Sequence, residues 1–347
     1  MYIKKIIGVI AGIGAIVGGV FAYNVYTAVF SDNTAFENEI AHLYVAPTGT
    51  FAEVKEDIEP LLKDVGTFIS VANQKGYVGN VKAGHFIIKK GMNNNEIINT
   101  IRSKNLPVKV AFNNQERLED LAGRISMQIQ ADSLSLIIAM RDPDFLREHD
   151  FNDATALAMY IPNSYEVFWN STGEEFRDRM FKEFKRFWNT ERQERADALK
   201  MTPQEVYVIA SIVQKETAKV DERPRVAGVY LNRIRRGIKL DADPTVIYAV
   251  KKNANDWNMV IKRVLYKDLE IESPYNTYRN AGVPPGPIFM PDVSSIDAVL
   301  KAEKHGYYYF VANVERFGYH KFAKTLSQHN ANSAAYRRWI SNQGVNR

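Results

Sequence analysis

The sequence predicts an α+β protein carried on an amino-terminal membrane helix. Three observations indicate this. The first 30 residues are apolar and almost uncharged, short strand and helix patterns follow in irregular order, and neither regular βαβ alternation nor an internal repeat is present. The 347 residues, 46% of them hydrophobic, are enough for one large or two ordinary domains.

Residues 1–30 are expected to form a single-pass membrane anchor. Lys4 and Lys5 precede an uncharged run of about 25 residues, which is long enough to cross a hydrocarbon core of roughly 30 Å. The two lysines should remain in the cytoplasm, with Tyr23 and Tyr26 at the far interface. A cleaved signal peptide is the alternative, but the run is long and no small-x-small cleavage site follows it. The rest of the chain is therefore expected outside the cytoplasm.

A polar spacer at residues 31–42 is expected to lead into a compact module at 43–112. Patterns of period 2 and 3.6 place its elements in order. The expected strands are 42–47, 83–90 and 106–112, and the expected helices are 51–65, 68–77 and 93–104.

A second α+β domain is expected at 113–340. It begins with a helical stretch at about 115–200 and continues with a helix from residue 202. The stretches 223–237 and 243–252 follow, then a loop rich in proline and glycine at 273–288 and two paired strands at 307–314 and 319–325.

Composition excludes several kinds of site. Without cysteine there are no disulfides, thiolate metal sites or cysteine nucleophiles. The 45 basic and 40 acidic residues are scattered rather than clustered, so nucleic-acid binding is not expected. His320 and His329 lack metal-ligand spacing and a neighbouring acidic cluster, and Ser211 lies inside a helix without a nucleophile elbow. We expect no metal and no cofactor.

The helix that begins near residue 202 ends at a carboxylate on its apolar face. Thr202 as N-cap, Pro203 at the first helical position and Glu205 as the reciprocal cap fix its register. At 100° per residue, Glu216 falls on the same stripe as Val206, Ile209, Ile212 and Val213, whereas Tyr207, Gln214 and Lys215 point elsewhere.

A carboxyl group among apolar neighbours has a raised pKa and suits a general acid. The alternative is that Glu216 is a buried ion-pair partner. Five arginines follow it closely and could supply the partner: Arg223, Arg225, Arg233, Arg235 and Arg236. Periodicity alone favours this structural role.

Polar and aromatic side chains gather in three stretches downstream, at 240–248, 273–288 and 319–330. In the second, Asn276 and Thr277 stand between Tyr275 and Tyr278. Rings beside amides and hydroxyls suit sugars, whose faces are apolar and whose edges form hydrogen bonds. The alternative for Asp243, which precedes a proline, is a helix N-cap, and the loop itself is compatible with a simple turn.

These stretches resemble the YceG-like (MltG-type) endolytic peptidoglycan transglycosylases. The resemblance is carried by "ASIVQKET" at 210–217, by 225–250, by "SPYNTYRNAGVPPGPI" at 273–288 and by 307–330. It covers residues 202–330 in order. Residues 43–112, including "KAGHFIIKKGMNNNEIINTI", resemble the LysM-like module of that family.

The sequence departs from the family pattern at three places. Gln214 stands where the family often has a second glutamate, which leaves Glu216 as the candidate in this motif. Upstream, "FNNQER" replaces the usual Pro-Glu-Gly element, and "YIPNSYEV" at 160–167 replaces Phe-Pro-Asp-Thr-Tyr. Sugar contacts in those two regions are therefore not carried over.

The resemblance implies a lytic enzyme of the bacterial cytoplasmic membrane that cleaves the MurNAc-GlcNAc β-1,4 bond in nascent peptidoglycan and leaves 1,6-anhydro ends. Glu216 would be the catalytic acid and base. The candidate substrate-binding residues are Asp243, Tyr248, Asn276, Thr277, Tyr278, His320 and His329. The implied partners are glycan strands and membrane-bound peptidoglycan synthases. Two alternatives remain: a hydrolase that uses Asp243 as its second carboxylate, and a non-catalytic wall-binding tether.

Overall fold

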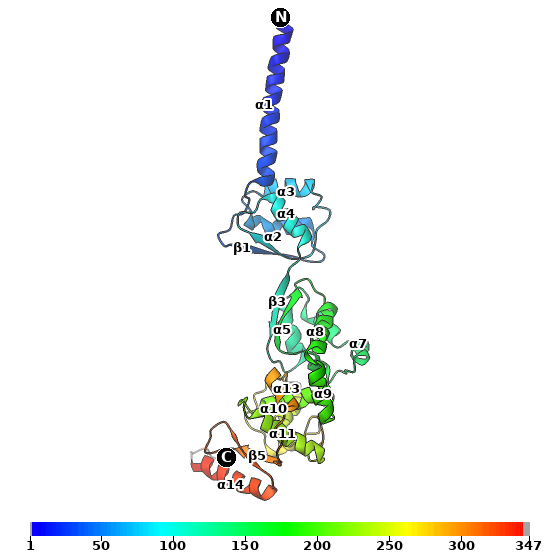
Figure 1. Ribbon diagram of the computed structural model, residues 1–347, viewed down its shortest axis with the longest axis vertical. Coiled ribbons are helices and arrows are strands. Elements are labelled where there is room, and N and C mark those ends of the chain that lie inside the picture. Colours follow the sequence, from blue (N-terminus) through cyan, green and yellow to red (C-terminus); the bar gives the residue numbers. More distant parts are fainter. Residues whose placement is uncertain (1, 343–347) are drawn as a thin grey trace. The chain divides into compact units, whose positions relative to one another are not determined.

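The computed structural model describes residues 2–342, which form two compact units of mixed α and β structure (Figure 1). The first unit runs from the amino terminus to Val110 and also includes Met127–Ala131 and Tyr165–Thr172. The second consists of Ala111–Ser126, Asp132–Ser164 and the chain from Gly173 onward. The α+β class expected from the sequence is confirmed.

The first unit consists of a long helix and a small layer of strands and helices. Its elements are α1 (Tyr2–Phe30), β1 (Ile40–Val45), α2 (Phe51–Ile58), η1 (Glu59–Leu61), α3 (Val65–Gln74), β2 (Gly84–Lys89) and α4 (Asn94–Ser103). Helix α1 buries none of its side chains, and within residues 2–342 it is the one helix long and apolar enough to cross a membrane.

A two-stranded antiparallel sheet and three helices enclose the core of this unit. Strands β1 and β2 pair from Ile40 opposite Lys89 to Val45 opposite Gly84. Leu43 and Val45 point inward and are 2% exposed, while the side chains that alternate with them face solvent. Helix α2 ends early, because Pro60 lies in the 3₁₀ turn η1 that follows it.

Residues 31–39, expected to be a polar spacer, are packed against the module. Asn33 is 4% exposed; its amide donates to the carbonyl of Asp64 at 2.8 Å and to Oδ1 of Asn94 at 2.7 Å. The amide of Asn94 in turn donates to the carbonyl of Ala28, in the last turn of α1, at 2.8 Å. This buried amide network fastens the end of α1 to α3 and α4.

Strand β3 (Pro107–Phe112), expected from the sequence at 106–112, does not extend the β1–β2 sheet. It pairs instead with β4 (Asn163–Phe168), a strand inside the stretch expected to be helical. The edge of β2 is already occupied, because the side chain of Asn105 accepts the backbone N–H of His85 at 3.0 Å. Pro107 has no N–H to donate to a ladder.

The second unit is mainly helical. Its remaining elements are α5 (Leu118–Ser126), α6 (Ser133–Met140), α7 (Pro143–Glu148), η2 (Ala156–Met159), α8 (Gly173–Phe187), α9 (Thr190–Leu199), α10 (Pro203–Glu216), α11 (Arg223–Arg235), α12 (Asp243–Ala254), η3 (Tyr266–Glu270), α13 (Val293–Leu300), β5 (Tyr309–Ala312), β6 (His320–Ala323) and α14 (Leu326–Asn342). Helix α10 is its central element and contacts α9, α11, α12, α13 and η2.

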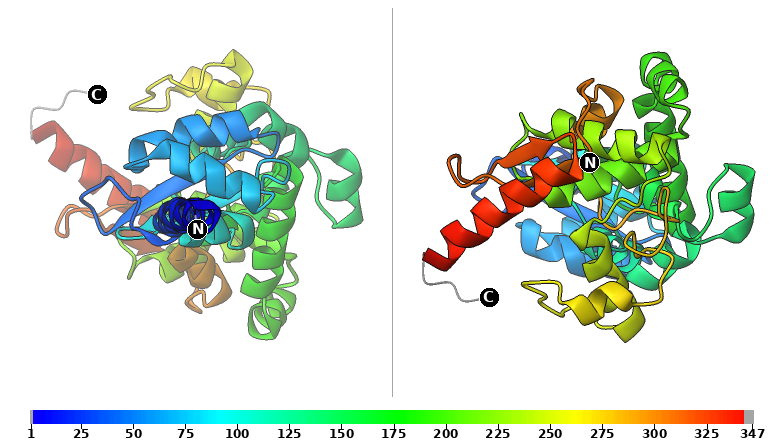
Figure 2. Two further views of the ribbon diagram at one scale, coloured as in Figure 1. Left: turned by 90° about the horizontal axis from the view of Figure 1, so that it is seen from above. Right: turned by 90° about the horizontal axis from the view of Figure 1, so that it is seen from below.

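The expected pair of strands near the carboxyl terminus is confirmed as the antiparallel hairpin β5–β6, with Tyr309 opposite Ala323. Helix α14 packs on this hairpin, as the view from below shows (red, Figure 2). Between η3 and α13 the chain contains no helix or strand, in agreement with the proline- and glycine-rich loop expected there.

Candidate active site

Helix α10 holds Glu216 in a fixed register. Oγ1 of Thr202 accepts the N–H of Glu205 at 3.2 Å, and the carboxylate of Glu205 accepts the N–H of Thr202 at 2.8 Å. Pro203 occupies the first turn. The predicted capping box is therefore confirmed, and Glu216 is the last residue of the helix.

The prediction of one apolar stripe on α10 was too narrow, because residues 206–213 are all buried. Tyr207, expected to point away from the core, is fully buried and donates its O–H to the carbonyl of Tyr160 at 2.8 Å. Oγ of Ser211 accepts the N–H of Ile288 at 3.1 Å and so ties the helix to the proline-rich loop. A helix that other helices surround has no solvent face to keep polar.

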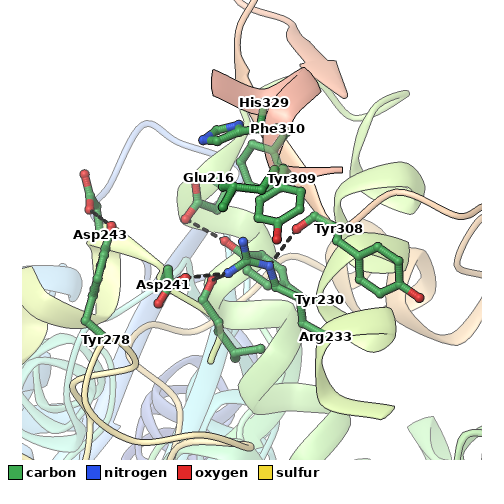
Figure 3. Close-up of a pocket in the computed structure, with 12 residues that line it drawn as sticks. Glu216, Tyr230, Arg233, Asp241, Asp243, Tyr278, Tyr308, Tyr309, Phe310 and His329 are labelled. Carbon is green, nitrogen blue, oxygen red and sulfur yellow. Dashed lines mark hydrogen bonds and ion pairs between the residues drawn. The ribbon is translucent and has the colours of Figure 1, made fainter. Parts of the chain in front are cut away.

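Glu216 lies in a cavity of about 400 Å³, here termed the Glu216 pocket (Figure 3). Its walls come from α10, α11, the loop before α12, β5 and α14. The lining residues are Glu216, Tyr230, Arg233, Leu240, Asp241, Asp243, Tyr278, Tyr308, Tyr309, Phe310, Leu326 and His329. Aromatic rings and polar groups together line the cavity, which is within the size range of small-ligand sites.

The hydrogen-bond partner of Glu216 is Tyr230, whose O–H donates to Oε1 at 2.8 Å. Burial raises the pKa of Glu216 to about 7, the hydrogen bond from Tyr230 opposes this rise, and the negative charge of Asp243 adds to it. Burial also raises the pKa of Tyr230 well above its usual value, so Tyr230 stays a donor. Glu216 is therefore a carboxyl group that exchanges its proton near neutral pH.

The alternative that Glu216 pairs with an arginine is wrong for residues 2–342, in which no ion pair to Glu216 occurs. Each of the five candidate arginines is engaged elsewhere. Arg223 pairs with Asp292, Arg225 with Glu303 and Arg233 with Asp241, while Arg235 donates to Asn232 and Arg236 lies over the ring of Tyr308.

Arg233 forms the frame of the Glu216 pocket. Its guanidinium pairs with Asp241 at 2.8 Å and donates to the carbonyls of Leu240 at 3.0 Å and Tyr308 at 2.7 Å. One buried side chain thus joins α11 to the loop before α12 and to the residue preceding β5. Its charge is balanced by Asp241 and not by Glu216.

Asp243 and Tyr278 form a second polar pair in this pocket. The O–H of Tyr278 donates to Oδ1 of Asp243 at 2.7 Å, and burial together with this bond raises the pKa of Tyr278. The alternative role of Asp243 as an N-cap is wrong, because Ala242 is the N-cap of α12 and Asp243 is the first helical residue.

The structure brings together four of the eight predicted site residues: Glu216, Asp243, Tyr278 and His329 line one pocket. The ring of His329 stacks on that of Tyr309 at 5.3 Å, and burial lowers the pKa of His329, which favours the neutral imidazole.

The other four lie outside this pocket. Asn276 and Thr277 are at most 1% exposed and hold the loop: the amide of Asn276 donates to the carbonyls of Leu269 and Ile271, and Thr277 accepts the N–H of Ala242. They position the pocket wall and have no exposed group for a ligand. Tyr248, 8% exposed, lines a different cavity.

His320 bonds to a buried carboxylate behind the pocket. Its Nδ1 lies 2.8 Å from Oε2 of Glu222, and its backbone N–H donates to Oε1 at 2.7 Å. Thr217, which follows Glu216, donates to the same carboxylate at 3.2 Å. This cluster joins the end of α10 to β6.

Sequence reasoning missed Tyr230 and the aromatic residues of β5, and it considered Arg233 only as a possible ion-pair partner of Glu216. Tyr230 and Arg233 are three residues apart on α11, and this spacing places them on one helix face. That spacing was the available signal. It gave no indication that this face meets Glu216.

The YceG-like family is matched by residues 43–335 of the chain. The chain belongs to this family. The endolytic murein transglycosylase of Bacillus subtilis (strain 168) is 29% identical over 293 residues, which cover 80% of this chain and 78% of that protein. The enzyme of the same name from Streptococcus pneumoniae (strain D39) is 31% identical over 180 residues, covering 51% of this chain and 31% of that protein.

A solved structure of a YceG-like protein, from Listeria monocytogenes, is 25% identical to this chain. The alignment has a TM-score of 0.56 and covers 85% of this chain and 99% of the Listeria protein. The family resemblance inferred from the motifs is thereby confirmed.

Proposed function

We propose that this member of the YceG-like family is an endolytic murein transglycosylase in which Glu216 is the catalytic acid and base. The observation that carries the assignment is the environment of Glu216. It is a carboxyl group in an aromatic and polar pocket, hydrogen-bonded to a neutral hydroxyl, with a pKa of about 7. Protonated and ionised forms are both accessible near neutral pH, and the chemistry requires both.

The reaction divides into two proton transfers. Glu216 first protonates the oxygen that links MurNAc to GlcNAc, and the bond from that oxygen to C1 of MurNAc breaks. The carboxylate so formed then takes the proton of the C6 hydroxyl of the same MurNAc while that oxygen bonds to C1. The products are a GlcNAc hydroxyl and a 1,6-anhydroMurNAc end, and Glu216 is protonated again.

A single carboxyl group is sufficient for this sequence, because the nucleophile belongs to the substrate. Asp243 has a different task in the proposal. Its carboxylate, held by the O–H of Tyr278, favours the positive charge that develops on the sugar ring as the bond breaks. The rings of Tyr309 and Phe310 offer apolar faces to the sugar.

The proposal places the enzyme on the outer face of a bacterial cytoplasmic membrane. Helix α1 has the length and composition of an anchor, and the two lysines in its first turn favour a cytoplasmic amino terminus. Residues 43–112 form a LysM-like module in this account, and the catalytic domain occupies 113–340. An anchored enzyme acts on strands close to the bilayer, where peptidoglycan synthases of the membrane would be its neighbours.

A matched pair of variants tests the role of Glu216. Purified full-length protein is incubated with peptidoglycan strands, and the lengths of the released chains are measured. Glu216→Gln should lower the cleavage rate by about a thousandfold, as expected for loss of a general acid. Glu315→Gln, which changes an exposed glutamate near the tip of the β5–β6 hairpin, should cleave like the wild type. Full cleavage by Glu216→Gln would contradict the assignment, and absence of cleavage by the wild type as well would favour a non-catalytic tether.

A further inference from the structure

The second unit contains another cavity, which shares no lining residue with the Glu216 pocket. It has a volume of about 290 Å³ and is here termed the Tyr248 pocket. The residues that matter for its chemistry are Glu119, Arg141, Asp153, Tyr248, Lys252 and Tyr275. The sequence predicted Tyr248 as a sugar contact. It lines this second cavity, however, and does not line the Glu216 pocket.

One wall of the Tyr248 pocket is aromatic and buried. Tyr248 and Tyr275 are 8% and 3% exposed, and their ring centroids lie 4.8 Å apart. The ring of Trp257 meets that of Tyr248 edge-on at 5.3 Å. A ligand against this wall would lose part of its water, and loss of water strengthens the charge interactions that it makes.

Carboxylates are in excess at one part of the pocket. Arg141 is shared between Glu119, at 2.9 Å from Oε1, and Asp153, at 3.1 Å from Oδ1. The two carboxylate side chains remain 41% and 72% exposed. Two negative charges around one guanidinium favour the approach of a further cation.

Lys252 supplies the opposite charge. It has no ion pair within residues 2–342, and its Nζ lies 5.2 Å from the ring centroid of Tyr275. The neighbouring cations are engaged already, since Lys251 pairs with Glu116 at 2.9 Å and Arg117 with Asp120 at 2.5 Å. Among residues 2–342, the pocket thus offers one cation without an ion pair, Lys252, and a pair of carboxylates beside an aromatic wall.

We infer that the Tyr248 pocket binds a short peptide bearing a free amine and a free carboxylate, and that this peptide is the stem peptide of the glycan strand. The carboxylate meets Lys252, and the amine meets Glu119 and Asp153. The inference rests on the proposed function for the identity of the strand. Cross-linking forms an amide between the amine of one peptide and the terminal carbonyl carbon of another, so each partner loses one of the two charges. The pocket therefore distinguishes uncross-linked strands from cross-linked ones.

Binding to the full-length Glu216→Gln protein tests this without turnover. The probes are uncross-linked strands with intact peptides, the same strands after acetylation of their amines, and strands stripped of peptides by an amidase. Intact strands should bind about tenfold more tightly than the other two, as expected for a hydrogen-bonded charge pair. Equal affinity for intact and acetylated strands would overturn the inference.

Single changes at the rim give the second arm of the test. In the Glu216→Gln protein, the added changes Lys252→Met and Asp153→Asn should each weaken binding of intact strands and leave binding of stripped strands unchanged. Lys262→Met, at an exposed position outside the pocket, is the matched control and should have no effect. If Lys252→Met binds intact strands like the control, the peptide site is wrong. Failure of the wild type to produce anhydro ends would instead count against the proposed function and leave these binding results intact.

Discussion

The hydrogen bond from Tyr230 to Glu216 sets the pH range in which the proposed acid is protonated. Burial raises the pKa of Glu216, and this bond opposes the rise because it favours the carboxylate. The resulting pKa is about 7. Tyr230→Phe removes the donor and should move the pKa above 7. The alkaline limb of the pH profile of kcat/KM should then shift upward by about one unit.

The control for this shift is Tyr266→Phe, since the side chain of Tyr266 is 89% exposed. Its profile should coincide with that of the wild type. An alkaline limb that moves to lower pH in Tyr230→Phe, or that stays in place, would contradict the role given to the bond.

The raised pKa of Glu216 also predicts a pH dependence of stability. The unfolded chain releases this proton near pH 4.5, whereas the folded protein keeps it until about pH 7. The folded state binds more protons between these values, so wild-type stability falls as pH rises through this window. The Glu216→Gln protein does not lose stability in this way. Its free energy of unfolding, relative to that of the wild type, should therefore rise by about 2 kcal/mol between pH 5 and 8.

Urea unfolding of both proteins at the two pH values measures this difference, with Glu315→Gln as the control for a simple loss of charge. A difference that stays constant with pH would show that Glu216 titrates in the folded protein as it does in the unfolded chain.

Residue-level reasoning from sequence succeeded where one helix carried all the information. The cap at Thr202 and Glu205 fixed the register, and the register placed Glu216. It failed for Tyr230, because the contact joins residues 14 positions apart on two helices, and their crossing is set by packing. The same limit explains why Asn276 and Thr277 were expected at the ligand rather than in the loop that supports it.

The Glu222–His320 cluster shows how elements are held around the site. Glu222 is 5% exposed, and its carboxylate contacts the hydroxyl of Thr217 and both the backbone N–H and ring Nδ1 of His320. The ring of His320 also packs edge-on against Phe310, at 5.0 Å, and Phe310 against Tyr230, at 6.0 Å. Helix α10, strand β6 and the pocket wall in β5 are thus joined through one cluster.

His320→Ala should destabilise the catalytic unit by about 3 kcal/mol, since it leaves a buried carboxylate short of a partner. The double variant Glu222→Gln with His320→Ala should cost clearly less than the sum of the two single changes, because the charge is then gone as well. Urea unfolding of the wild type, the two single variants and the double variant gives the coupling free energy between the two side chains. Strict additivity would show that the two side chains act independently.

Element types were largely predictable and their pairing was not. Period-2 alternation correctly indicated β5 and β6, but β4 was missed inside a helical stretch, and no pattern indicated that β3 would pair with it. Local pattern reports which face of an element is apolar. It does not report which strand edge already forms hydrogen bonds with a side chain, as β2 does where His85 donates its backbone N–H to Asn105.

At the scale of the first unit, the buried amides of Asn33 and Asn94 join the end of helix α1 to the module that follows it. Asn94 is 1% exposed and bonds to Ala28, Asn33 and Thr67. Asn94→Ala should therefore loosen the junction and speed proteolysis after Glu37 and Glu39, in the segment between α1 and β1, by several-fold.

The comparison is made on protein in lipid bilayer discs, with Asn99→Ala as the matched change on the exposed side of α4. Equal cleavage rates in the two variants would show that the amide network does not hold the junction. The sequence predicted a spacer here because residues 31–39 are polar. Burial of the Asn33 amide depends on partners 31 and 61 residues further along the chain.

The central claim for the whole molecule is that one carboxyl group, Glu216, cleaves the glycan without a water nucleophile. The most direct test is the mass of the new MurNAc ends formed by the wild type in water enriched in heavy oxygen. The account predicts 1,6-anhydro ends, lighter than reducing ends by one water and free of the heavy isotope. Reducing ends that carry heavy oxygen would contradict it and would assign Asp243 the part of a second catalytic carboxylate.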